Sequence, residues 1–237
     1  MIGDKSVIDS TQFNSSIWQE NYSAPNVESW VFRWWNRVGK QSVIQSQKSN
    51  SQHPASLDHG CGQGTAVNFF HNQGFDAYGV DVSNMAISEG KEMYPEITEK
   101  LFEIDPLLEN FSLSNKKFSL ITSIQTMYYL SPDDREIVMA RLKDLSMPKA
   151  VFYLTMMTSV GTYFDNSVEL DNGMRHVKFT DDRISVDQHI CFVKDENHFS
   201  QMFPMLKVIE IGQYLQSFRR SDFNHECTHL AITTKWR

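Results

Sequence analysis

Cysteine is scarce in the 237-residue chain, which has three cysteines, Cys61, Cys191 and Cys227. They form neither a CxxC pair nor a spacing typical of metal ligands, so the sequence predicts no metal site and no disulfide framework. Unpaired cysteines of this kind are typical of a reducing compartment, and we expect a cytoplasmic protein. The 41% of hydrophobic residues is enough for the core of one large domain.

Long hydrophobic runs and an excess of positive charge are also missing. No stretch of about 18 apolar residues could span a membrane, and the opening MIGDKSVIDSTQFNSS lacks the apolar segment of a signal peptide. The formal net charge is −7, and an acidic protein is a poor partner for phosphate backbones and anionic lipids. We expect neither a nucleic acid nor a membrane as partner, and the sequence indicates no particular oligomeric state.

Residues 1–52 differ in character from the rest of the chain. After a polar, turn-rich start, Val and Trp residues recur at helical spacing from Val27 to Val38. Gly39 is expected to end this helix, and the polar residues 41–54 are expected to form a linker. We therefore predict an N-terminal helical or lid segment over residues 1–52 and a main domain over residues 53–237.

From His53 onward, short apolar strands alternate with helical segments, which predicts parallel βαβ units with right-handed crossovers. The expected strands are residues 55–57, 77–81, 101–104, 120–124 and 150–155, and the expected helices are residues 65–73 and 86–93 and a segment that starts at Ser131. Ser83 and Ser131 are candidate helix caps. The buried face of the helix after Ser131 is predicted to hold Ile137, Val138, Leu142 and Leu145.

The alternation stops after Thr158. Asn172-Gly173 stands between two extended stretches, which is a typical signal of a hairpin turn, and RISVDQHICFV alternates between polar and apolar residues. This pattern predicts a small antiparallel insertion at about residues 158–195. A helix near residues 196–203 and strands at 207–211 and 228–234 then complete the predicted sheet.

The stretch SLDHGCGQGT, Ser56 to Thr65, lies between the first strand and the following helix, at the edge of the sheet where α/β folds bind ligands. A dinucleotide-binding G-x-G-x-x-G does not fit, because Thr65 or Val67 occupies the position of the third glycine. A phosphate-binding loop needs Lys after its last glycine, whereas Thr65 follows Gly64. The loop therefore excludes the two commonest nucleotide-binding motifs.

Four segments resemble, in this order, the motifs of class I S-adenosylmethionine-dependent methyltransferases of the small-molecule type. They are LDHGCGQG, YGVDVS, EIDP and FSLITSIQTMYYL, and the resemblance covers residues 53–156. It implies a Rossmann-like α/β fold with a mainly parallel seven-stranded sheet, helices on both faces and an antiparallel final strand. To this fold the sequence adds the N-terminal helical cover and the β insertion after strand five. The resemblance also implies S-adenosyl-L-methionine as methyl donor and S-adenosyl-L-homocysteine as product.

The resemblance implies a cofactor site made of Asp58, Gly60, Cys61, Gly62, Gly64, Asp81, Val82, Met85, Asp105, Gln125 and the lid residue Tyr22. Asp58 and the Gly60 carbonyl would accept hydrogen bonds from the ammonium group, and Asp81 from both ribose hydroxyls. Asp105 would accept from the adenine amino group, although Pro106 stands where family members often have an N–H donor. Val82 and Met85 would pack on the adenine, and Gln125 would face the methionine end.

Methyl transfer is an in-line displacement, for which the enzyme mainly aligns the two reactants and excludes water. A hydroxyl acceptor usually needs a general base, and the candidates are Tyr128, His176 and His189. The expected acceptor site, which would suit an anionic or sugar-like molecule, consists of Trp18, Tyr128, Tyr163, Arg175, His189 and Arg219.

The predicted function is transfer of a methyl group to an oxygen or nitrogen of a small-molecule metabolite. Protein and nucleic acid acceptors are disfavoured, because IQTMYY stands where an Asn/Asp-Pro-Pro-Tyr/Phe signature would follow strand four. Two alternatives remain open at this point. One is a non-catalytic regulatory protein that binds the cofactor or a nucleoside, and the other is a nicotinamide-dependent oxidoreductase, against which the glycine spacing argues.

Overall fold

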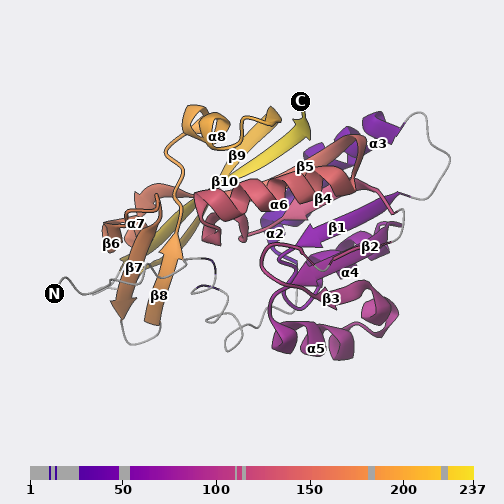
Figure 1. Ribbon diagram of the computed structural model, residues 1–237, viewed down its shortest axis with the longest axis horizontal. Coiled ribbons are helices and arrows are strands. Elements are labelled where there is room, and N and C mark those ends of the chain that lie inside the picture. The colour runs from indigo at the N-terminus through magenta and orange to yellow at the C-terminus, as the bar shows by residue number, and fades with distance from the viewer. Residues whose placement is uncertain are drawn as a thin grey trace.

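A seven-stranded sheet lies at the centre of the computed structural model (Figure 1). The structure describes Thr11, Asn14 and residues 27–47, 54–109, 111–113, 116–180, 185–219 and 224–237. Its strands, in spatial order, are β3 (Leu101–Glu103), β2 (Asp76–Asp81), β1 (Ala55–His59), β4 (Phe118–Ser123), β5 (Ser146–Gly161), β10 (Asn224–Trp236) and β9 (Leu206–Arg219).

The direction of the strands confirms the predicted mainly parallel sheet. The five strands from β3 to β5 pair in parallel, whereas β10 is antiparallel to both β5 and β9. The chain order reverses between β1 and β4, so that their carboxyl ends form the switch point at which such sheets bind ligands. β5, β9 and β10 are much longer than the sequence predicts, and they extend past the other strands.

Helices cover both faces of the sheet, and the structure confirms the two predicted caps. These helices are α4 (Thr65–Asn72), α5 (Asn84–Met93), η2 (Pro95–Lys100), η3 (Met127–Tyr129), α6 (Pro132–Leu145), α7 (Thr162–Asp165) and α8 (Glu196–Met202). The Ser83 hydroxyl accepts from the backbone N–H of Ala86, and the Ser131 hydroxyl from that of Asp134, each at 3.2 Å. Both serines thus satisfy an otherwise free N–H at a helix start.

The buried face of α6 differs in part from the prediction. Val138 and Leu142 are buried as expected, but Ile137 is exposed and Leu145 is half-buried. The buried stripe runs through Arg135, Val138, Met139 and Leu142, at the helical spacing of i, i+3, i+4 and i+7. Ile137 falls between these positions and therefore points to solvent.

The tryptophan-rich segment forms one longer helix than predicted. It consists of α2 (Ser29–Trp34), the π-helical turn η1 (Trp35–Gly39) and α3 (Lys40–Gln47). The predicted end at Gly39 is wrong, and residues 41–47 of the predicted linker are helical. The packing of the tryptophan rings requires a residue without a side chain at Gly39, because a Cβ atom there would lie 2.9 Å from ring atoms of Trp34 and Trp35.

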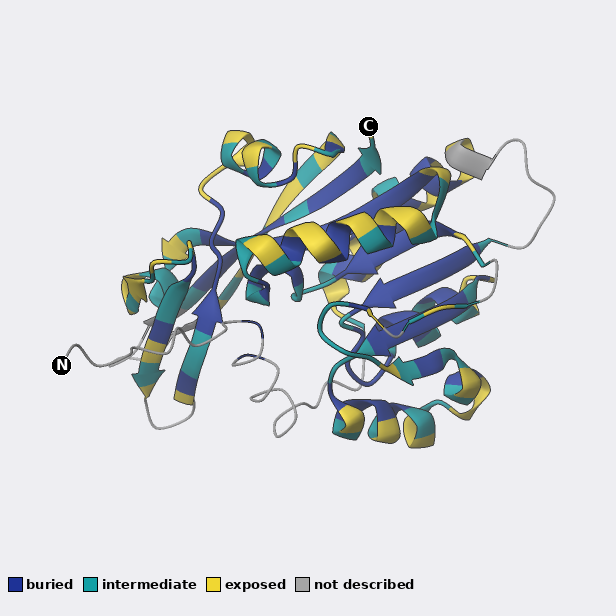
Figure 2. Ribbon diagram, in the orientation of Figure 1, coloured by how far each residue is buried: buried dark blue, intermediate teal, exposed yellow. Residues whose placement is uncertain are grey.

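Two hydrophobic cores lie on opposite faces of the sheet, and β5 contributes to both. Phe152 and Leu154 pack on the side of α6, whereas Tyr153 packs on the side of α2, where its ring stacks on that of Trp34 at 3.8 Å. Figure 2 shows the central strands as buried and the outer surface of α6 as exposed. The strands therefore consist almost entirely of buried residues, as expected of a parallel sheet covered on both faces.

The predicted insertion is a separate three-stranded antiparallel sheet of β6 (Ser167–Glu169), β7 (Arg175–Thr180) and β8 (Ser185–Ile190). Gly173 has a φ of 76°, as a tight turn between β6 and β7 requires. The insertion is joined to the loop after β4, because the N–H of Cys191 donates to the carbonyl of Tyr128 at 2.8 Å. This contact places β8 beside the carboxyl edge of the main sheet.

Candidate functional site

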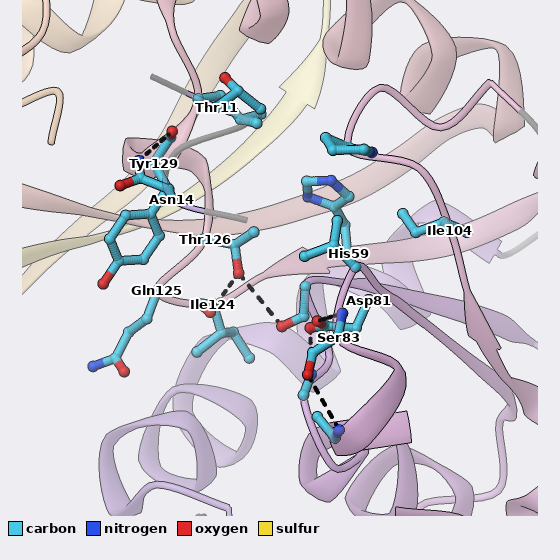
Figure 3. A pocket seen from close by; sticks show the side chains of 16 residues that line it. Thr11, Asn14, His59, Asp81, Ser83, Ile104, Ile124, Gln125, Thr126 and Tyr129 are labelled. Carbon is cyan, nitrogen blue, oxygen red and sulfur yellow. Dashed lines mark hydrogen bonds between the residues drawn. The ribbon is translucent and has the colours of Figure 1, made fainter. Parts of the chain in front are cut away.

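A pocket opens at the carboxyl ends of β1, β2 and β4, at the predicted switch point (Figure 3). One side is formed by the glycine loop and the start of α5, and the other by the loop that follows β4. Ile104 and Pro106, directly after β3, add an apolar wall. The pocket thus lies where the three sequence motifs after β1, β2 and β4 converge.

The glycine loop needs its glycines. Gly60, Gly62 and Gly64 have φ angles of 73°, 53° and 79°, which L side chains rarely adopt. A Cβ atom at Gly60 would lie 2.1 Å from the Thr126 hydroxyl oxygen. The backbone of the loop therefore runs close to the pocket, and Gly60 and Gly62 both line it.

Asp81, at the end of β2, is the charged residue among the described residues that line the pocket. Its Oδ2 accepts the N–H of Gly62 at 2.7 Å and its Oδ1 accepts the N–H of Ser83 at 2.9 Å. Burial raises the pKa of Asp81, and these backbone N–H groups lower it in part. A carboxylate held in this way has lone pairs left for two hydroxyl groups, and it repels a phosphate.

Asp58 does not line the pocket, in contrast to the expected ammonium contact. It lies buried behind the loop, where its Oδ1 accepts the Thr122 hydroxyl at 2.6 Å. The pKa of Asp58 is raised to about 7, mainly by burial and to a smaller extent by the charge of Asp81, while the hydrogen bond from Thr122 lowers it in part. The pocket is instead lined by the next residue, His59, because successive residues of a strand point to opposite faces.

His59 is a pocket residue that the sequence analysis missed. Its Nδ1 lies 3.1 Å from the Ser123 hydroxyl, and burial lowers the pKa of the imidazole to about 4. The ring is therefore uncharged at neutral pH. The strand alternation around Asp58 is the sequence signal that could have found it.

The structure gathers about half of the expected cofactor residues around the pocket. Those that line it are Gly60, Gly62, Asp81, Val82 and Gln125. Cys61, Gly64 and Met85 lie near it without lining it, and Asp105 accepts the N–H groups of Leu107 and Glu109. Asp105 thereby holds the turn that carries Pro106 into the pocket wall. Tyr22 and Trp18 lie outside the described residues.

The expected acceptor residues whose side chains the structure describes do not line the pocket. Arg175 is held by Ser167, whose Oγ and carbonyl accept from Nε and Nη2 at 2.7 and 3.0 Å, and it lies over the Phe164 ring. Tyr128 is buried behind Tyr129, which lines the pocket in its place.

Other expected acceptor residues belong to the insertion. The Nε2 of His176 lies 2.7 Å from the Asp187 carboxylate, and the buried His189 ring packs edge-on against His176. Tyr163 packs against Phe179, and the side chain of Arg219 lies outside what the structure describes.

Thr11 and Asn14 are two further pocket residues without a sequence signal. The Asn14 side chain donates to the carbonyls of Tyr129 and His189 at 2.8 and 2.6 Å and accepts the N–H of His189 at 2.9 Å. It thereby satisfies the free edge of β8. Thr11 donates to the Asp134 carboxylate at 2.5 Å. These contacts connect Thr11 to the start of α6 and Asn14 to the insertion.

A family model for the methyltransferase domain matches residues 37–203. The chain belongs to this family. It is a class I S-adenosylmethionine-dependent methyltransferase, and S-adenosylmethionine is its methyl donor. The donor fits the observed site, because a carboxylate between two backbone N–H groups suits a ribose, and the glycine backbone leaves room for a ligand. No curated protein sequence shows a significant match.

Solved structures share the fold at low identity. The PH0226 protein from Pyrococcus horikoshii OT3 matches with a TM-score of 0.59 and 13% identity, over 91% of this methyltransferase and 95% of that chain. An S-adenosylmethionine-dependent methyltransferase from Clostridium acetobutylicum ATCC 824 gives 0.52 and 14%, over 86% and 97%. The CcbJ methyltransferase from Streptomyces caelestis gives 0.55 and 12%, over 83% and 94%.

Replacing Asp81 with Ala is expected to weaken the affinity for S-adenosylhomocysteine about 100-fold, because two hydrogen bonds to a charged acceptor are lost. Calorimetric titration checks this. Asp76→Ala is the matched control, since Asp76 lies at the opposite end of the same strand and pairs with Lys100 and Lys116. Equal affinities of the Asp81 variant and the wild type would rule out the ribose contact.

Replacing Asn14 with Ala should weaken the same affinity about tenfold, because this wall of the pocket loses its hydrogen bonds to β8 and to Tyr129. Asn36→Ala serves as control, since the exposed Asn36 side chain donates to the Phe32 carbonyl within its own helix. An Asn14 variant that binds as tightly as the control contradicts a role of Asn14 in the donor site.

Asp58 should make stability depend on pH. Its pKa is about 7 in the folded protein against 3.8 when exposed, so the folded state holds the proton more tightly. The free energy of unfolding therefore falls as pH rises from about 4 to 7, by at most about 4 kcal/mol. Urea unfolding at several pH values should show Asp58→Asn gaining on the wild type over this window, and a constant difference would contradict the assignment.

Proposed function

We propose that this methyltransferase transfers the methyl group of S-adenosylmethionine to an oxygen or nitrogen of a small-molecule metabolite. The surroundings of the pocket are the observation that carries the proposal. Thr11 and Asn14 line it on one side, and the β6–β8 insertion is hydrogen-bonded to the loop after β4 at the same edge of the sheet. A pocket flanked in this way suits a small acceptor better than a folded protein or a duplex.

One structural neighbour supports an acceptor that is not a folded protein or a nucleic acid. It is the glycopeptide N-methyltransferase MtfA, whose complex with S-adenosylhomocysteine matches with a TM-score of 0.53. The net charge of −7 also argues against nucleic acid. The three cysteines are buried free thiols, which agrees with a reducing compartment such as the cytoplasm.

We assign the donor-binding roles to residues that line the pocket. Asp81 would accept from both ribose hydroxyls, and the Gly60 carbonyl would accept from the ammonium group. Val82 and Ile104 would pack on the adenine, with Pro106 beside it. When bound, the donor supplies an electrophilic methyl group on a positively charged sulfur. The protein then aligns the acceptor and excludes water, which is the greater part of catalysis for this reaction.

The described pocket argues against an anionic acceptor. Asp81 is its charged residue, no Lys or Arg lines it, and Arg175 is held by Ser167 instead. An anionic acceptor would therefore meet no Lys or Arg among the described lining residues, and only the positive charge of the donor would offset the charge of Asp81.

Methyl-labelled S-adenosylmethionine and a panel of metabolites test the proposal. We expect label in a small molecule together with S-adenosylhomocysteine in equal amount, and calorimetric binding of both cofactor forms but not of NAD. Asp81→Ala should abolish this turnover at low donor concentration. Label that appears only in added protein or nucleic acid would refute a small-molecule acceptor, and binding without turnover would indicate a regulatory binder.

A further inference from the structure

Three rings from distant parts of the chain stack on the sheet face that α2 covers. The Tyr214 ring, on β9, lies between Trp30 of α2 at 4.2 Å and His229 of β10 at 4.8 Å, with interplanar angles of 11° and 1°. Both faces of Tyr214 are therefore occupied. The ring can offer a ligand only its edge, which carries the hydroxyl group.

The Tyr214 hydroxyl contacts the pocket through Gln125. The Gln125 Nε2 lies 3.4 Å from the Tyr214 Oη, and the backbone N–H of Gln125 donates to the Thr155 hydroxyl at 2.8 Å. Gln125 has a φ of 54°, which is unusual for a residue other than glycine. These contacts hold Gln125 in that conformation at the end of β4, where it lines the pocket.

With its Nε2 turned to Tyr214, Gln125 has its Oε1 left to accept a hydrogen bond, and no described residue donates to that oxygen. Beside the stack, the Trp30 Nε1 and the Tyr153 Oη are buried without a hydrogen-bond partner among the described residues. Tyr153 is fully buried, 6.5 Å from the Trp30 ring. Buried polar atoms of this kind are rare and are usually satisfied by a ligand or water.

The groups around Tyr214 are mostly uncharged. Burial lowers the pKa of His229 to about 4 and raises that of Cys227 to about 12, and burial also raises the pKa values of Tyr153 and Tyr214. Glu28, exposed at the start of α2, is the remaining titratable group whose charge acts on Tyr214. Such surroundings penalise a charged acceptor.

We propose that the methyl acceptor is an uncharged amine whose N–H donates to the Gln125 Oε1, and that Tyr214 is the positioning residue that holds the Gln125 amide. This inference rests on the proposed function and narrows it. The amine nitrogen's lone pair forms the new bond to the methyl carbon, while the carbon–sulfur bond breaks and its electron pair stays on sulfur. The methylated ammonium then loses its proton to water.

The pocket favours an amine over a hydroxyl for a further reason. An amine attacks through its own lone pair, whereas a hydroxyl usually needs a base. His59 is the imidazole of the pocket, but its Nδ1 is engaged by Ser123 and its pKa is about 4, which makes it a weak base.

The test uses labelled S-adenosylmethionine with four sets of compounds: amines that are largely uncharged at neutral pH, alcohols, phenols, and carboxylates or phosphates. The same compounds are tested for binding to the S-adenosylhomocysteine complex by saturation-transfer NMR. We expect binding and label in the amine set. The pH at which acceptor kcat/KM reaches half its plateau should shift with the basicity of the amine chosen.

Tyr214→Phe should lower acceptor kcat/KM about tenfold and leave the S-adenosylhomocysteine affinity unchanged, with Tyr94→Phe at the end of α5 as a matched control. If Tyr214→Phe unfolds, Gln125→Met tests the same contact. Label in alcohols, phenols or anions, no amine binding at millimolar concentration, or full activity of the variants would overturn the inference. If the wild-type protein does not bind S-adenosylhomocysteine, the proposed function itself is refuted.

Discussion

The Asp81 carboxylate, which accepts one backbone N–H from the glycine loop and one from the start of α5, is the interaction on which the donor site depends. Its bond to Gly62 fixes the glycine loop after β1, and its bond to Ser83 fixes the start of α5. Ser83 in turn caps α5. A single side chain thus sets the distance between the loop and the helix, and it also supplies the acceptor groups for a ribose. The glycine loop and the start of α5 therefore cannot shift independently of each other.

The donor half of the site could be predicted because it is built from local sequence. Each motif follows a strand directly, and parallel strands end at a common edge, so the order of motifs gives their positions in space. The described pocket differs from the expected set at single residues. His59 lines it and Asp58 does not, because strand alternation decides which side chain faces the pocket. Similarly, Pro106 and Ile104 line the pocket while Asp105 holds their turn.

The acceptor half could not be predicted, because it depends on contacts between residues far apart in sequence. Trp30, Tyr214 and His229 meet only because β9 and β10 extend past the end of β4, and the sequence predicted both strands as short. Asn14 stands in a polar tract whose sequence carries no periodic signal. Arg175 was predicted as an acceptor residue because it is charged and lies in the insertion. In the structure its guanidinium group instead donates to Ser167, on the neighbouring strand β6.

Asp58 and Asp81 indicate how this architecture links stability to ligand binding. Two carboxylates lie in one buried region, without a Lys or Arg partner among the described residues, and each is costly to ionise there. Carboxylates without compensation are retained where function needs them, at the expense of stability. A donor with a positively charged sulfur and an ammonium group would relieve this cost when bound, so binding would stabilise the folded state by mass action as well as by contact. In the proposed arrangement the acceptor would lie beside Gln125, whose partner Tyr214 has mostly uncharged surroundings. The pocket would then offer an acidic half, at Asp81, to the cationic donor and a neutral half, at Gln125, to an uncharged acceptor.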